Sequence, residues 1–417
     1  MSSQTGAIQI PPLARGLALL STQLAAAPHR LMFFAGAAAA MTSMLWWACF
    51  LGAGYAGYPF PTPPIPAEWA HAMLIQYGML PLFICGFLLT VFPRWMNQPA
   101  LSKIHYVPVF AGMFGGYLLA HVGLLDMKPL LIAGLGMMLT GWSIALATLT
   151  RLLWRNGFQD RHTVSCGMAL LFGAFGLASF LAFTLGAPWQ LAVVAIKIGT
   201  FGCLLPVYFT VCHRIIPFFS ASVVPGYVAV KPTWSLPVLW VLLLLHAYFE
   251  LTHRFEWLWF VDVPLAAFFL WHWLAWQPWK CLRPRLLAVL YLSFAWLPIA
   301  FGLFAIQSLI LCFDGAFVLG RGPVHALTIG FFGSMLVAMV TRVTQGHSGR
   351  PLQMGVIPWA TFALLQIVAL VRIGAELATN TRGWVIVAGF GWLLAFLPWV
   401  LRSLWIYLTP RADGKPG

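Results

Sequence analysis

Charged residues are scarce in this sequence, and acidic residues are scarcer than basic ones. Only 8% of the 417 residues are charged, and nine residues are Asp or Glu. A soluble domain carries about 25% charged residues, so most of this chain's surface does not face water. Together with a hydrophobic content of 61%, this excludes an ordinary soluble domain and predicts an all-α polytopic membrane protein.

Paired cysteine motifs are also missing. The seven cysteines form no CxxC pair, so neither a zinc site nor a redox dithiol is indicated. The formal charge of +14 does not indicate nucleic acid either, because the basic residues are not gathered on one face. They lie in short runs between apolar segments, where topology signals lie, so membrane lipid is the expected surrounding and no nucleic-acid partner is expected.

What the sequence has instead is a series of long apolar runs. A bilayer core about 30 Å thick needs about 20 apolar residues per helix. We predict about twelve spans, and they cover residues 30–53, 69–93, 104–125, 129–150, 164–185, 189–212, 234–251, 258–277, 286–311, 323–341, 355–378 and 384–408. These spans form one predicted domain over residues 30–408, followed by a tail over 409–417, and the sequence shows no internal repeat and no soluble domain.

The distribution of Lys and Arg predicts the orientation. Of the 23 basic residues, 17 lie in the N-terminal segment, the even-numbered loops and the C-terminal segment, whereas four lie in the odd-numbered loops. Because Lys and Arg favour the cytoplasmic side, both termini are expected in the cytoplasm of a bacterial inner membrane.

The first 29 residues are predicted to form a cytoplasmic surface segment. Leu13, Leu17, Leu20 and Leu24 repeat at helical spacing, as in a helix that lies on a membrane. A signal peptide is the alternative, because Arg15 precedes an apolar stretch and three alanines, but polar residues interrupt that stretch.

Two histidines at membrane depth are the main candidate for cofactor binding. Ionisable side chains inside a membrane are costly and often functional. His71 in the second span and His325 in the tenth are both expected about 5 Å inside the outer boundary. Two imidazoles at one depth could approach a flat haem from opposite faces, because haem iron is commonly held by histidine. The alternative is a pair of buried histidines that hydrogen-bond to neighbouring helices.

Four further residues extend this candidate site. Gly78 and Gly333 follow the two histidines by seven and eight residues and would leave room for a wide macrocycle, or would serve close helix packing. Lys197 and Arg372, in the outer halves of their spans, could bind the haem carboxylates. Alternatively, Arg372 pairs locally with Glu376, and Lys197 snorkels or pairs with an acid.

A second group of histidines lies at the predicted cytoplasmic ends of the spans. His29, His213 and His347 each have an arginine nearby and could bind a metal, an anion or a second cofactor. Interfacial anchoring is the alternative for these three residues. His246 and His272 are expected to be packing residues.

Several segments resemble the NnrS family of bacterial membrane proteins. The resemblance spans the first to the eleventh predicted helix and is carried by Pro28-His29-Arg30-Leu31-Met32-Phe33-Phe34, His213-Arg214-Ile215-Ile216-Pro217-Phe218-Phe219, His325-Ala326-Leu327-Thr328-Ile329-Gly330 and Gly346-His347-Ser348-Gly349-Arg350-Pro351-Leu352. It implies a membrane protein containing haem b and copper, with a role in nitric oxide metabolism, denitrification or protection from nitrosative stress. It also implies haem ligation by His71 and His325.

One departure from the family pattern concerns the second span. Family members carry Trp-His-Ala-His-Glu-Met where this chain has Glu68-Trp69-Ala70-His71-Ala72-Met73, so a His and a Glu are replaced by Trp69 and Ala72. A copper site is therefore doubtful here.

This span is also similar to the second helix of haem–copper oxidase catalytic subunits, which supplies a haem ligand. The copper histidine motif of those enzymes is missing, so their full active site is not predicted, and the likeness is an analogy of fold.

The predicted function is therefore a haem-binding inner-membrane protein whose small ligand is nitric oxide or a similar molecule. Whether it has redox activity on nitric oxide, and which respiratory-chain partner it has, the sequence does not decide. A secondary transporter without a cofactor and an assembly factor for a respiratory complex are the alternatives.

Overall fold

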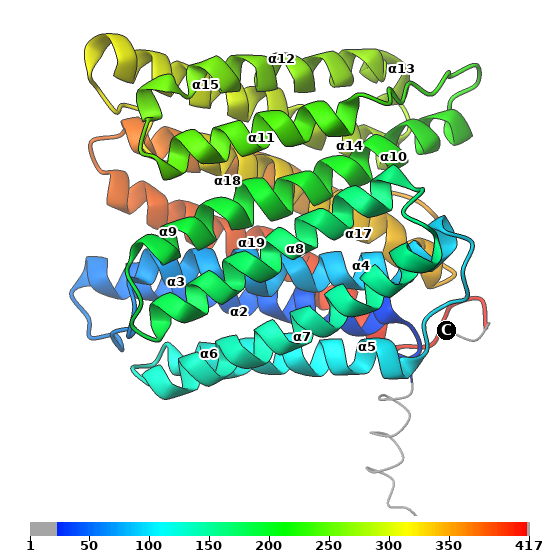
Figure 1. Cartoon of the computed structure of the whole chain (residues 1–417), viewed down its shortest axis with the longest axis horizontal. Coiled ribbons are helices and arrows are strands. Elements are labelled where there is room, and N and C mark those ends of the chain that lie inside the picture. Colours follow the sequence, from blue (N-terminus) through cyan, green and yellow to red (C-terminus); the bar gives the residue numbers. More distant parts are fainter. Residues whose placement is uncertain (1–22, 415–417) are drawn as a thin grey trace, which may run out of the picture.

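The computed structural model describes residues 23–414, so most of the predicted N-terminal surface helix lies outside the described residues. Between residues 23 and 414 the elements are helices, with no strand, and most of them run along the long axis of the molecule (Figure 1). Ten helices in this described part of the chain are long and apolar enough to cross a membrane, which confirms an all-α polytopic membrane protein.

Five spans are essentially continuous α-helices, one of them closed by a 3₁₀ turn: α2 (Pro28–Ala56), α7 (Lys128–Arg155), α8 (Arg161–Thr184), α18 (Val356–Gly374) with η6 (Ala375–Leu377), and α19 (Thr381–Leu408). Local chemistry fixes where several of them begin. Proline occupies the first turn of α2 and α7, where its missing N–H costs nothing. Asp160 caps α8 by accepting hydrogen bonds from two backbone N–H groups.

Four spans contain a stretch of π-helix, which sequence periodicity does not predict. They are α3 (Ala67–Met73), η1 (Leu74–Met79) and α4 (Leu80–Trp95); α5 (Lys103–Phe110), η2 (Ala111–Gly115) and α6 (Gly116–Gly123); α9 (Gln190–Lys197), η3 (Ile198–Leu204) and α10 (Leu205–Val223); and α16 (Gly322–His325), η5 (Ala326–Gly333) and α17 (Ser334–His347). Such π segments are rare and often mark functional sites.

The remaining predicted spans are a bent helix and two short ones. The ninth span consists of α14 (Arg285–Phe294) and α15 (Trp296–Asp314). The seventh and eighth, α11 (Ser235–Leu251) and α12 (Trp259–Ala275), have 17 residues each. At 1.5 Å per residue each is about 26 Å long, at the lower limit for crossing a bilayer. The turns η4 (Phe255–Trp257) and α13 (Pro278–Cys281) flank α12.

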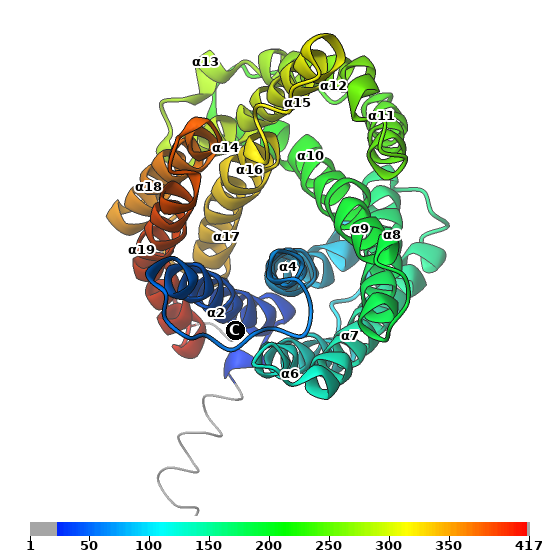
Figure 2. The same ribbon diagram turned by 90° about the vertical axis from the view of Figure 1, so that its left-hand side faces the viewer.

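The second span lies inside the bundle and is enclosed by the others. Figure 2 shows α4 within a ring of helices, with α10 and α17 beside it. Side chains of α4, α10 and α17 indeed surround one small apolar cavity. The first and last spans, α2 and α19, pack against each other. The second span, Ala67–Trp95, is the most deeply buried of the ten long ones.

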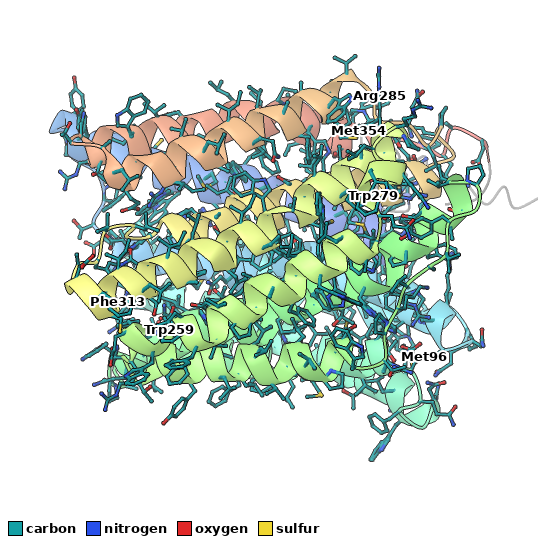
Figure 3. The ribbon with its side chains drawn as sticks, turned by 90° about the horizontal axis from the view of Figure 1, so that it is seen from above. Met96, Trp259, Trp279, Arg285, Phe313 and Met354 are labelled. Atoms are coloured by element: carbon teal, nitrogen blue, oxygen red, sulfur yellow. The ribbon has the colours of Figure 1, made fainter. Side chains whose placement is uncertain are left out.

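The two ends of the described chain meet at one end of the bundle. Arg30 donates hydrogen bonds to the carbonyl oxygens of Tyr407, 2.8 Å away, and Thr409, 2.6 Å away. We call this the terminal end. Figure 3 shows Met96 and Arg285 toward it, whereas Trp259 and Phe313 lie at the opposite end, which we call the distal end.

Candidate cofactor site

A cavity of about 500 Å³ opens between the helices in the distal half of the bundle. Ligand pockets occupy about 300–1,000 Å³, so this space could hold a cofactor. Three of the four π segments contribute to its wall, through Gln76 of η1, Thr200 of η3, and Thr328 and Gly333 of η5. The cavity therefore lies where the second, sixth and tenth spans depart from regular α-helix.

His71 and His325 both line this cavity, as do Lys197, Arg372 and Gly333. These residues come from four spans that are far apart in the sequence. The structure therefore brings five of the six predicted cofactor-binding residues to one place.

The His325 ring is held in a defined tautomer. Its Nδ1 lies 2.8 Å from the carbonyl oxygen of Arg321, one turn earlier. A carbonyl oxygen only accepts, so Nδ1 carries the proton and Nε2 keeps its lone pair. Histidines that bind metals are commonly oriented by such a bond from the other ring nitrogen. His325 therefore has the chemistry of a metal ligand.

The His71 ring is oriented by stacking. It lies against the indole of Trp47, with ring centroids 4.6 Å apart and an angle of 12° between the planes. Its Nδ1 is buried and has no hydrogen-bond partner in the described part of the chain. Because a buried polar atom without a partner is costly, this nitrogen marks a place where a ligand would be favourable.

The two cations at the cavity each have a carboxylate partner. Arg372 Nη1 lies 2.6 Å from Glu376 Oε1, and Lys197 Nζ lies 2.6 Å from Glu250 Oε2. The local pairing expected for Arg372 and Glu376 is thus present, and Lys197 pairs with an acid. Arg372 keeps further N–H groups that could bind an anionic group in the cavity.

A family model for NnrS proteins matches residues 23–411. The chain belongs to the NnrS family. No curated protein shows significant similarity to it. The match covers all the described spans and every residue of the cavity.

Trp69 and Ala72, where the resemblance led us to expect a His and a Glu, both line the cavity of this NnrS protein. Within residues 23–414, no group of three or more His, Cys, Asp or Glu side chains could hold a metal ion. A haem brings its own nitrogen ligands, so the two imidazoles of His71 and His325 could hold one without a larger cluster of protein ligands.

Gly78 does not line the cavity of this NnrS protein, although the spacing predicted that it would lie near the face of His71. A Cβ atom on Gly78 would lie 2.5 Å from the Tyr117 ring, so this glycine allows the second and third spans to pack closely. The physical reason is η1, which begins after His71 and contains Gly78. Its wider turn moves Gly78 off the face that α-helical spacing implies.

The structure places the three predicted histidines of the terminal end in two different surroundings. His29 and His347 have ring centroids 4.2 Å apart. His213 instead contacts His162, with Nε2 of His162 3.0 Å from Nδ1 of His213. The sixth span packs on α8, which carries His162, so these two histidines meet.

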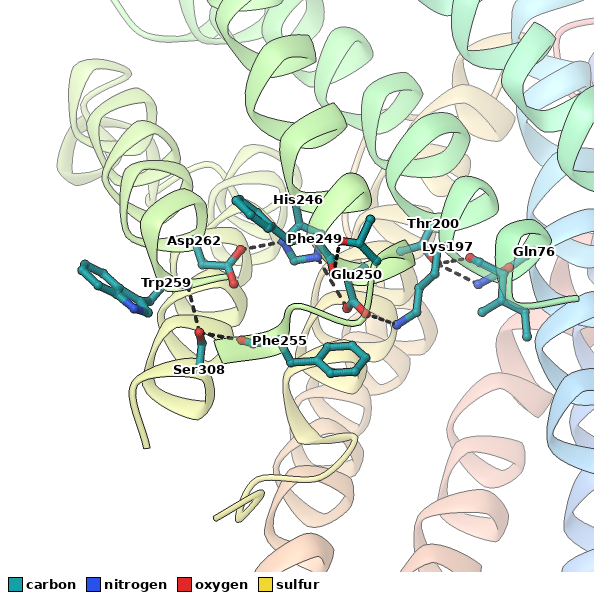
Figure 4. Close-up of polar contacts among 12 residues, drawn as sticks. Gln76, Lys197, Thr200, His246, Phe249, Glu250, Phe255, Trp259, Asp262 and Ser308 are labelled. Carbon is teal, nitrogen blue, oxygen red and sulfur yellow. Dashed lines mark hydrogen bonds and ion pairs between the residues drawn. The ribbon is translucent and has the colours of Figure 1, made fainter. Parts of the chain in front are cut away.

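Sequence reasoning missed a set of buried acids beside the cavity. Glu250 and Asp262 lie on α11 and α12, and His246 lies between them (Figure 4). The signals that could have found them are the i,i+4 spacing of His246 and Glu250 and an aspartate within an apolar run. His246 is buried, as expected of a packing residue, but both of its ring nitrogens face carboxylates.

Proposed function

We propose that this protein binds haem in the distal cavity, with His325 and His71 as the iron ligands, and that it acts in nitric oxide metabolism or protection from nitrosative stress. The NnrS family is associated with a nitric oxide response and with haem and copper binding in the membrane. When bound, the haem would supply an iron; because four haem nitrogens and the two histidines would fill its six coordination positions, nitric oxide could bind only after one histidine had left.

The proposal rests on the hydrogen bonding of the ring nitrogens in the two imidazoles. The hydrogen bond from His325 Nδ1 to Arg321 leaves Nε2 available, and His71 has a buried nitrogen without a partner. Both rings belong to the wall of one cavity. A pair of structural histidines would be expected to use these nitrogens in hydrogen bonds to other helices.

The cavity wall also suits the rest of the cofactor. Its surface is mostly apolar, which suits a macrocycle, and Arg372 and Lys197 would attract the two carboxylates of haem. Gly333 leaves space beside His325. Orientation in the membrane remains part of the proposal: both termini would lie in the cytoplasm, so the cavity would open toward the outer leaflet.

The test is the visible spectrum of detergent-purified protein from haem-replete cells. We expect a Soret band that is lost in His325→Gly and strongly reduced in His71→Ala, and we expect added imidazole to restore it in His325→Gly. His105→Ala is the matched control, because His105 contacts Ser102 at the start of α5 outside the cavity. A colourless wild-type protein would contradict the proposal and favour a transporter.

The nitric oxide part of the proposal needs a separate measurement. Adding the gas to the reduced protein should shift the Soret band. An unchanged spectrum would leave the haem site in place and would remove its role as a nitric oxide site.

A further inference from the structure

Four ionisable side chains form a line that ends at the cavity (Figure 4). Asp262 Oδ1 lies 2.6 Å from His246 Nδ1, and His246 Nε2 lies 3.7 Å from Glu250 Oε1. Glu250 Oε2 in turn lies 2.6 Å from Lys197 Nζ. The line therefore crosses three spans, from α12 through α11 to α9. We call these four residues the distal chain.

The distal chain is buried, and its central member has apolar neighbours on its other sides. His246 and Asp262 are fully buried, and Glu250 is 4% exposed. The rings of Phe201, Phe301 and Phe304 surround His246, with centroids between 4.1 and 5.8 Å away. The two carboxylates are thus the polar groups that its two nitrogens face.

An imidazole between two carboxylates is suited to passing protons. One ring nitrogen can receive a proton while the other releases one, and histidine titrates near neutral pH. Ionisable groups at membrane depth are costly to bury and commonly mark proton relays. Asp262 Oδ2 and His246 Nε2 also lack hydrogen-bond partners in the described part of the chain, so the hydrogen bonding is incomplete and protons are not locked in one arrangement.

We propose that the distal chain carries protons to the cavity. Protonated Asp262 gives its proton to Nδ1 of His246 while Nε2 of the same ring gives a proton to Glu250 Oε1. The products are an Asp262 carboxylate, a neutral His246 with its proton on Nδ1, and a protonated Glu250. The total charge is unchanged and no electron moves.

The step from His246 to Glu250 controls the transfer. Their separation of 3.7 Å is longer than a hydrogen bond, so one side chain must move by about 1 Å before the proton can pass. Glu250 and Lys197 both line the cavity, so a proton on Glu250 has reached the cavity wall. Protonation of Glu250 also frees Lys197 from its ion pair, which makes the cavity more positive for any ligand.

A fixed set of ion pairs is the alternative, and infrared spectroscopy separates the two. We would record pH-difference spectra of the whole purified protein in H₂O and D₂O between about pH 5 and pH 9. A relay predicts a carboxylic-acid carbonyl band that changes with pH and shifts in D₂O. Fixed ion pairs hold both carboxylates ionised, and then no such band appears.

Variants show which carboxyl group gives this infrared band. Asp262→Asn should abolish it or leave only a Glu250 component. Glu250→Gln should move the midpoint of the remaining titration, because Asp262 and Glu250 titrate as a coupled set through the His246 ring that lies between them. In His246→Gln the two acids lose their link, so Glu250→Gln should then have little effect on the Asp262 band.

Glu376→Gln is the matched control, because Glu376 pairs with Arg372 and not with the distal chain. It should leave the band unchanged. Absence of the band in wild type would overturn the proposal. A band that survives unchanged in both Glu250→Gln and His246→Gln would also overturn it. These two variants still give a result if Asp262→Asn does not fold. The measurement needs no haem, so its failure is distinct from failure of the haem proposal.

Discussion

Arg372 and Glu376 form an ion pair of 2.6 Å across one helical turn, and Arg372 lines the cavity. The pair is largely buried, with 9% and 15% of the two side chains exposed. The carboxylate therefore competes with any anion in the cavity for the same guanidinium.

This ion pair predicts that substitutions of Arg372 and Glu376 affect haem binding differently. Arg372→Gln should weaken haem binding by about tenfold, because a charge-assisted contact to a haem carboxylate is lost. Glu376→Gln should not weaken binding, since it frees Arg372 for that contact. Haem titration of the apoprotein followed by Soret absorbance measures both, and Arg254→Gln at an exposed turn is the control. Equal losses in both variants would show that the pair acts only on stability.

A second prediction concerns the close approach of the third and fourth spans. A Cβ on Gly141 would lie 2.5 Å from the backbone nitrogen of Met113. Backbone atoms cannot yield as a flexible side chain can, so Gly141→Ala should destabilise the protein by about 1–3 kcal/mol. Thermal unfolding in detergent would measure the change.

Gly136 in the same helix provides the control for Gly141. A Cβ at Gly136 meets no atom within 4 Å. Gly136→Ala should therefore be neutral or slightly stabilising, because alanine favours a helix by about 1 kcal/mol over glycine. Similar losses in the two variants would contradict the packing argument.

A third prediction follows from Gly320, which has a left-handed φ of +48° and lies against the Glu376 carboxylate. A side chain there is strained by the backbone and also overlaps Glu376. Gly320→Ala should lower stability by about 1–3 kcal/mol and should change the haem affinity, because Glu376 has to move. Gly302→Ala in α15, where a Cβ meets nothing within 4 Å, should change neither.

A fourth prediction concerns pH and the loop before α8. Burial acts to raise the pKa of Asp160, but hydrogen bonds from Arg214 and from the backbone of Thr163 outweigh it, and the pKa lies below its ordinary value. A carboxylate with a lowered pKa stabilises the fold above its unfolded pKa of about 3.9 and loses that contribution as the pH falls through the folded value.

Thermal unfolding between about pH 6 and pH 3 tests this. Asp160→Asn should lower stability near neutral pH by about 1 kcal/mol, because the ion pair with Arg214 and the negative charge at the helix N-terminus are lost. The difference from wild type should shrink toward acid pH. Asp314→Asn, at the exposed end of α15, should show no such trend. A constant difference at every pH would contradict the assignment.

The sequence predicted the spans better than the site, for a physical reason. A lipid environment demands long apolar helices, so spans such as α7 and α19 can be recognised from composition alone. Depth in the membrane also follows from position in a span, and this placed His71 and His325 at one level. Their convergence on one cavity depends on packing between distant spans, which hydropathy does not contain.

The misses have local causes. Gly78 lies off the helix face predicted from its spacing to His71, because η1 has the wider turn of a π-helix. No residue pattern in the sequence predicts that π-helix. His246 and Asp262 are 16 positions apart on different helices, so their contact could not be seen in either span alone. We expected His213 near His29 because both lie at predicted cytoplasmic ends of spans with an arginine nearby, whereas the structure places it against His162 on α8.

Electron cryomicroscopy of the protein purified from haem-replete cells tests the central claim most directly. We expect planar density in the distal cavity, with Nε2 of His325 within coordination distance of its centre and the His71 ring on the other side. A cavity that contains only lipid, or histidines that hydrogen-bond to neighbouring helices across a closed space, would contradict the haem account.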